Sequence, residues 1–156
     1  MEILVPMWRT NRINRKERNI MIETYSNNIT VASNAAVPMN TAFRKGTTVT
    51  KSGDATLQLN KCGIYVVDVN AVGVAGAGGL ITIQLLVNGV AVPYAFASET
   101  AADTTSTHNL AFSTKVQVPA TYNECCPCST PFTVTLVNTG VETTYSLVNV
   151  LVTKLV

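Results

Sequence analysis

The feature that most constrains the fold of this chain is a succession of short runs of β-forming residues separated by turn-forming residues. Within several runs apolar and polar residues alternate, which places the two kinds of side chain on opposite faces of a strand. No convincing helical pattern follows residue 21. We therefore expect strands over residues 28–32, 47–50, 56–60, 64–74, 80–87, 90–97, 109–118, 132–137 and 145–155, after a β-like start at 21–25.

Eight to ten strands at regular spacing favour an antiparallel sandwich or barrel. Asn88-Gly89 lies between two of the runs and predicts a hairpin with a type I′ turn, because both central positions of that turn need a positive φ. Pro93 lies in the run that follows. Because proline has no amide hydrogen for a β-ladder, we expect this strand at a sheet edge or with a bulge.

Two runs, residues 64–67 and 147–152, are apolar at successive positions and so on both faces of the expected strand. In a small sandwich one face of a sheet normally meets water. A strand that is apolar on both faces indicates that its outer face is covered, and a second copy of the chain is the simplest cover. We therefore expect an obligate homo-oligomer.

Residues 1–20 form a basic arm with a net charge of +3, whereas the rest of the chain has a net charge of −1. The body therefore lacks the positive field that attracts nucleic acid, and we expect no nucleic-acid partner for it. Three interpretations of the arm are open: a peptide that docks on a capsid or fibre-base protein, a nucleic-acid arm, or a solvated tail. The docking interpretation assigns the contacts to Trp8, Arg9, Arg12, Arg15, Lys16 and Arg18.

Hydrophobic residues make up 47% of the chain, which is enough for a full core. No apolar run reaches the roughly 18 residues that span a bilayer, so we expect no membrane partner. The apolar start at residues 1–8 is short and precedes its positive charges, which is the reverse of the order in a secretory signal. We therefore expect no export by the secretory route.

The pattern from Tyr25 onward resembles the trimeric jelly rolls of the complement-head and tumour-necrosis-factor type, which have relatives among bacteriophage fibre, head-decoration and spore-surface domains. The segments that carry the resemblance are residues 57–67, with a turn, Gly63 and Tyr65; residues 83–90, with Asn88-Gly89; residues 132–140; and residues 150–156. The resemblance implies an all-β jelly-roll sandwich over residues 21–156, assembled as a homotrimer, with the first and last strands near each other. It also implies apolar and aromatic side chains along the three-fold axis, for which the candidates are Tyr65, Tyr94, Phe96, Phe112 and Tyr145.

Three of the four cysteines, Cys125, Cys126 and Cys128, lie within four positions, and Cys62 is far away in the sequence. Their spacing is wrong for a structural zinc site with two Cys-x-x-Cys pairs, yet they offer two or three thiolate ligands and Cys62 a fourth. A disulfide from Cys62 to one of the three, or four free thiols, are equally open interpretations. We therefore expect no cofactor, with a structural zinc ion as the one open alternative.

We expect no enzymatic activity. The single histidine, His108, has no nucleophile motif around it and is typical of a surface residue of a loop or strand. The acidic residues are spread singly, whereas glycoside hydrolysis needs two that converge, and Asp54 and Asp103 suit Asx-type turns.

The sequence thus favours a structural virion protein, a trimeric head-fibre, decoration or tail-fibre domain with a host glycan as a candidate ligand. A binding module of the same fold on a bacterial cell or spore surface is the alternative, and a β-sandwich hydrolase is the least favoured.

Overall fold

A computed structural model describes residues 20–120 and 132–155. The described residues form strands and no helix, so no helix of this part of the chain is long and apolar enough to cross a membrane. The strands are β1 (Met21–Val31), β2 (Thr41–Lys45), β3 (Val49–Ser52), β4 (Thr56–Leu59), β5 (Gly63–Ala75), β6 (Gly79–Val87), β7 (Val90–Ala101), β8 (His108–Val118), β9 (Phe132–Asn138) and β10 (Thr143–Lys154).

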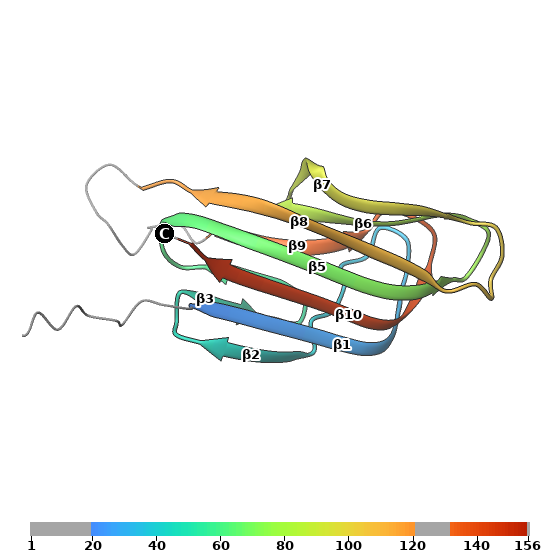
Figure 1. Cartoon of the computed structure of the whole chain (residues 1–156), viewed down its shortest axis with the longest axis horizontal. Coiled ribbons are helices and arrows are strands. Elements are labelled where there is room, and N and C mark those ends of the chain that lie inside the picture. The colour runs from blue at the N-terminus through green and yellow to red at the C-terminus, as the bar shows by residue number, and fades with distance from the viewer. Residues whose placement is uncertain (1–19, 121–131, 156) are drawn as a thin grey trace, which may run out of the picture.

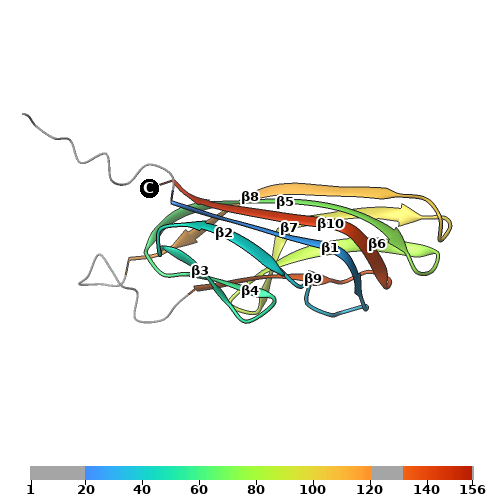
Figure 2. The ribbon, with the colours of Figure 1, turned by 90° about the horizontal axis from the view of Figure 1, so that it is seen from below.

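The strands make two five-stranded antiparallel sheets that lie face to face (Figures 1 and 2). Sheet I has the order β2-β1-β10-β5-β8, and sheet II has the order β3-β4-β9-β6-β7. From β3 onward the chain crosses repeatedly between the two sheets, and β1 pairs with β10 over most of its length. The predicted all-β jelly-roll sandwich and the expected neighbourhood of the first and last strands are therefore confirmed.

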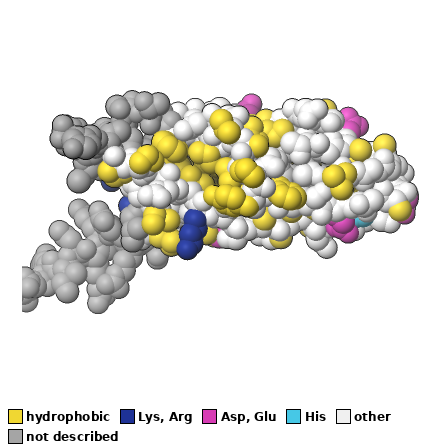
Figure 3. All heavy atoms as spheres, turned by 90° about the horizontal axis from the view of Figure 1, so that it is seen from above, with side chains coloured by type: hydrophobic (Ala, Val, Ile, Leu, Met, Phe, Trp, Pro, Cys, Tyr) yellow, Lys and Arg dark blue, Asp and Glu magenta, His cyan; other side chains and the backbone are white. Residues whose placement is uncertain are grey.

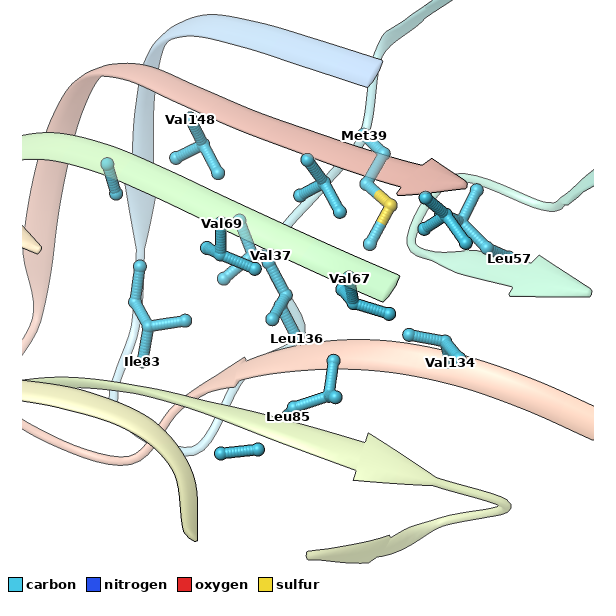
Figure 4. Close-up of a cluster of buried hydrophobic side chains, with 14 of the residues drawn as sticks. Val37, Met39, Leu57, Val67, Val69, Ile83, Leu85, Val134, Leu136 and Val148 are labelled. Atoms are coloured by element: carbon cyan, nitrogen blue, oxygen red, sulfur yellow. The ribbon is translucent and has the colours of Figure 1, made fainter. Parts of the chain in front are cut away.

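Alternation along the strands builds the core between the sheets. In β8, for example, Leu110, Val116 and Val118 are buried, whereas Lys115 and Gln117 between them are exposed. Figure 4 shows valine and leucine side chains of the two sheets meeting in the middle, with Val37 and Met39 from the segment between β1 and β2 among them.

The hairpin at Asn88-Gly89 is confirmed. Asn88 has a φ of 51° and Gly89 a φ of 78°, which are the positive values that a type I′ turn needs. The turn joins β6 to β7, and the side-chain oxygen of Asn88 accepts a hydrogen bond of 2.9 Å from the amide of Thr133 in β9. The hairpin is therefore tied to the strand on its other side.

The two expectations for the strand that contains Pro93 are both confirmed. β7 is the edge strand of sheet II, and its pairing with β6 shifts between Gln84–Phe96 and Leu86–Ala91. The bulge between these pairs contains Pro93. The amide of Gln84 closes the bulge, because its Nε2 donates to the carbonyl oxygens of Val92 at 2.6 Å and Ala95 at 3.1 Å.

The structure adds one strand that the sequence pattern did not predict and merges two predicted segments. β2 is exposed at every position, so it has no apolar alternation to detect. The segments 21–25 and 28–32 join into the single strand β1, in which Asn28 adopts a φ of 50°. Asparagine tolerates this left-handed conformation better than most residues, which lets the strand continue past the irregularity.

Candidate interaction surfaces

The outer face of sheet I carries exposed apolar side chains, as predicted from the two runs that are apolar on both faces of their strands. Val148, Val150 and Val152 of β10 point into the core, whereas Leu147 is 38% exposed and Leu151 is half-buried on the opposite side. Val66 of β5 lies on this outer face too, next to Thr153 in the register. No helix among the described residues covers this face, so the apolar side chains of its central strands meet solvent in a single copy of the chain.

An aromatic pair extends this face to its edge. The rings of Tyr25 on β1 and Phe43 on β2 are stacked, with centroids 6.4 Å apart and planes at 23°. Phe43 is 64% exposed. An exposed stacked pair gives a rigid apolar surface at small entropic cost, which is typical of interface residues.

A second apolar surface lies where β7 and β8 border the open side of the sandwich. Val90 is 70% exposed and Tyr94 is 73% exposed. Tyr94 lines a shallow hollow together with Val87 and Val92 of sheet II and Lys115, Val116 and Gln117 of β8. We call this surface the edge patch. Figure 3 looks onto this side of the molecule, which is uppermost in Figure 1, and shows hydrophobic side chains gathered along its middle.

The aromatic side chains expected on a three-fold axis divide between the core and the surface. Tyr65 and Tyr145 are completely buried, so the interpretation of these two as axis residues is wrong. Phe112 is partly buried against the core and lines a shallow hollow with Asp68 and Leu151. The Tyr65 hydroxyl donates to the carbonyl oxygen of Lys61 at 2.6 Å, which supplies the polar partner that a buried tyrosine needs. Tyr94 and Phe96, both on β7, are exposed.

His108 is not the surface residue that its sequence context suggested, because it is only 8% exposed. It begins β8, and its Nδ1 lies 3.1 Å from Oε1 of Glu99 on β7, a contact that links the two sheets. Both ring nitrogens are shielded from solvent. The imidazole is therefore enclosed between the two sheets, with the Glu99 carboxylate as its charged neighbour.

Asp103 forms the predicted Asx-type turn between β7 and β8. Its Oδ1 accepts hydrogen bonds from the amides of Thr105 at 3.0 Å and Ser106 at 2.7 Å, and the Ser106 hydroxyl donates to Oδ2 at 2.9 Å. The two amide bonds lower the pKa of this carboxyl group from 3.8 to about 2. Asp103 therefore has a structural role. Asp54, the other residue expected in such a turn, lies in the turn between β3 and β4.

The predicted metal ligands Cys125, Cys126 and Cys128 lie outside the described residues, as do the predicted docking residues Trp8, Arg9, Arg12, Arg15, Lys16 and Arg18. Cys62 is described: it is half-buried just before β5 and lines a hollow with Pro119 and Ala120. These two residues lead into the segment that holds the other cysteines. Among the described residues no group of three or more potential metal ligands comes together.

Comparisons with known proteins find similarity in structure only. No protein-family model matches the chain, and no curated protein sequence does. Among solved structures, Eiger TNF from S. frugiperda is similar with 12% identity and a TM-score of 0.60 over 88% of this chain and 93% of that one.

Two further structures agree with this likeness. Murine APRIL at pH 8.5 has 8% identity and a TM-score of 0.54 over 88% of this chain and 100% of that chain. Rabbit GITRL has 13% identity and a TM-score of 0.51 over 88% of this chain and 94% of that chain. The fold is therefore the jelly roll of tumour-necrosis-factor-like proteins, as the resemblance in the sequence implied.

Proposed function

We propose that this chain is a non-enzymatic structural protein that works as a subunit of a homotrimer. The observation that carries the proposal is the apolar surface that a single copy leaves uncovered, on the outer face of sheet I and at the edge patch. Large exposed apolar patches on soluble proteins mark interfaces. The shielded position of His108 supports the absence of catalysis, because the one histidine of the chain is not available to a substrate.

The two apolar surfaces suit a contact in which the edge patch of one copy packs on the outer face of sheet I of the next. A contact between two different surfaces generates a ring when the rotation closes, and the resemblance of the sequence to trimeric jelly rolls favours closure after three copies. Charge supports the pairing as well. Lys115 borders the edge patch, and Asp68 lies on the outer face of sheet I among the residues of a shallow hollow with Asn70 and Leu151.

Replacing Tyr94 with lysine should dissociate the trimer. Tyr94 is 73% exposed, so the change leaves the core intact, but it places a charge in an interface that excludes water. Light scattering at micromolar concentration should give three times the chain mass of 16.6 kDa for the unaltered protein and the monomer mass for the variant.

Thr104→Lys is the matched control, since it adds the same charge in the exposed connection between β7 and β8. This variant should keep the trimeric mass. A monomeric unaltered protein, or a trimer that Tyr94→Lys leaves intact, would contradict the proposed assembly.

We further propose that the trimer is a virion component, a head-fibre, decoration or tail-fibre domain that its basic arm attaches to a capsid or fibre-base protein. The likeness of the sequence to bacteriophage jelly rolls supports this location, and so does the concentration of positive charge in residues 1–20. The described strands begin at Met21, and the carbonyl oxygen of Ile20 accepts a hydrogen bond from the amide of Lys154. We therefore expect the described fold to form without the arm.

Deleting residues 1–19 should therefore preserve the folded trimer and abolish its incorporation into particles. The circular dichroism spectrum and the mass should match those of the full chain, whereas immunoblots of purified virions should lose the protein. Substituting the five basic residues of the arm by glutamine tests charge separately from length. Unchanged incorporation of the deletion variant would overturn the docking role, and detection of the protein on bacterial cells or spores in place of particles would overturn the virion location.

A further inference from the structure

The outer face of sheet II is a regular array of uncharged hydrogen-bonding side chains. Across β3, β4 and β9 the register aligns one row, Ser52, Thr56 and Thr135, and a second row, Thr50, Gln58 and Thr133. Members of a row lie on adjacent strands about 4.8 Å apart, and the rows are two residues or about 6.7 Å apart. The Oγ1 atoms of Thr56 and Thr135 are 3.4 Å apart.

No strand of sheet II directs a charged side chain to this face. The charged residues of its strands are Lys51 on β3 and Glu99 on β7. They oppose Leu57 and Ile81, two core residues, and so lie on the inner side of the sheet. The outer face of sheet I differs, since it bears Asp68 and Lys115 in the hollows described above. The lack of charge is thus a property of one face and not of the whole surface.

Exposed apolar side chains complete the array on the β6 and β7 side. Phe96 is 46% exposed and opposes Gln84, whose side chain faces outward because its neighbours Ile83 and Leu85 are in the core. Leu80 is 51% exposed on the same face. Between them the hydroxyl groups of Thr82 and Ser98 are 2.8 Å apart. The polar rows and the ring of Phe96 therefore share one face of the sheet, with β6 between β9 and β7.

We propose that the outer face of sheet II binds a neutral polysaccharide. Hydroxyl and amide side chains donate to and accept from sugar hydroxyl groups, and the phenyl ring of Phe96 offers a surface to the apolar C–H side of a sugar ring. A face without cations has no partner for the carboxylates or sulfates of an acidic glycan, whose desolvation would go uncompensated. The strand spacing is close to the length that one pyranose unit adds to an extended glycan chain.

The availability of this face rests on the proposed trimer, which covers the outer face of sheet I and the edge patch and leaves sheet II to the outside. A trimer would present three such faces, and multivalent attachment to a repeating polymer strengthens binding well beyond the affinity of one face. Binding of this kind would serve attachment to a sugar-coated host surface.

Affinity electrophoresis of the full-length protein tests the proposal. The gels contain dextran, laminarin, mannan or glycogen as neutral polysaccharides and alginate or heparin as acidic ones. We expect retardation by at least one neutral polymer and by neither acidic polymer. Phe96→Ala and Thr135→Lys should each weaken the retardation constant about tenfold or more, because the first removes the ring and the second places a charge in the array.

Thr104→Lys, which adds the same charge away from this face, should retain full binding. Circular dichroism and light scattering of every variant separate lost binding from lost folding. Three results would overturn the proposal: no retardation by any neutral polymer, retardation by the acidic polymers alone, or binding by Phe96→Ala and Thr135→Lys as strong as that of the unaltered protein. A trimeric mass without binding would overturn this inference alone, whereas a monomeric mass would contradict the proposed function.

Discussion

Replacing Asn138 with alanine should lower the free energy of unfolding by about 3–5 kcal/mol, because a buried side chain loses three hydrogen bonds to backbone groups at once. Asn138 is fully buried at the end of β9. Its Nδ2 donates to the carbonyl oxygens of Val31 at 3.0 Å and Val141 at 2.8 Å, and its Oδ1 accepts from the amide of Gly140 at 3.1 Å. Alanine removes all three hydrogen bonds at a buried position, and the carbonyl oxygen of Val141 keeps the bond that the Thr143 hydroxyl donates at 2.9 Å.

Denaturant unfolding monitored by circular dichroism measures the loss, with Asn149→Ala as the matched control. Asn149 is half-buried on the outer side of β10, and its Nδ2 donates to Oε1 of Glu23, a side-chain partner, at 2.9 Å. We expect this variant to lose about 1 kcal/mol or less. Asn138→Asp should be at least as damaging as the alanine variant, since a carboxylate cannot donate to the carbonyl oxygens. Equal effects of the alanine substitutions at positions 138 and 149 would show that the buried amide contributes little.

The position of Asn138 connects this stability to the proposed assembly. Its hydrogen bonds join the end of β1, through Val31, to the connection that leads from β9 into β10. β1 and β10 are neighbours in sheet I, and their outer faces carry Tyr25 and Leu147 of the proposed interface. We therefore expect a destabilised Asn138 variant to lose its trimer at lower denaturant concentration than the unaltered protein.

The sequence predicted the elements whose signals are local. Alternation in residues 109–118 depends on one strand alone, and the turn at Asn88-Gly89 depends on two residues. Pro93 predicted an edge strand or a bulge because its missing amide hydrogen excludes a paired central position. β2 was not predicted, because a fully exposed edge strand has no buried side that would require alternating apolar residues.

The sequence could not predict which face of each strand points inward. Tyr65 and Tyr94 are both aromatic residues of expected strands, yet Tyr65 is fully buried and Tyr94 is 73% exposed. The burial of Tyr65 follows from the register of β5 between β10 and β8, and the exposure of Tyr94 follows from the bulge that Gln84 closes. His108 was misinterpreted similarly, because its polar neighbours do not reveal that the strand it begins turns it toward Glu99.

The proposed polysaccharide-binding surface, the outer face of sheet II, could not be predicted from the sequence. Thr50, Gln58 and Thr133 form one row, although the third is far from the first two in the sequence. Each is an unremarkable polar residue of a strand when taken alone. Only the pairing of β3 with β4 and of β4 with β9 brings them together, and only the register shows that Lys51 and Glu99 lie on the other side.

Replacing Gly140 with alanine should cost about 4 kcal/mol of unfolding free energy through a clash between backbones. A Cβ at this position would overlap the carbonyl oxygen of Leu80 and lie 2.7 Å from the amide nitrogen of Thr82. The neighbours of Gly140 hold the same strand, since the amide of Thr139 donates to Thr82 at 3.1 Å and the amide of Val141 donates to Leu80 at 2.9 Å. Space for a methyl group therefore requires both hydrogen bonds to lengthen, which adds their loss to the cost of overpacking.

Gly53→Ala separates this steric effect from the usual cost of replacing glycine. Gly53 has a φ of +70°, but nothing lies within 4 Å of a Cβ built there, so its substitution adds conformational strain alone, about 1–2 kcal/mol. Thermal unfolding should thus rank the variants with Gly140→Ala well below Gly53→Ala. The reverse order would contradict this prediction. It would show that the close approach of the β9–β10 connection to β6 is not what requires glycine at position 140.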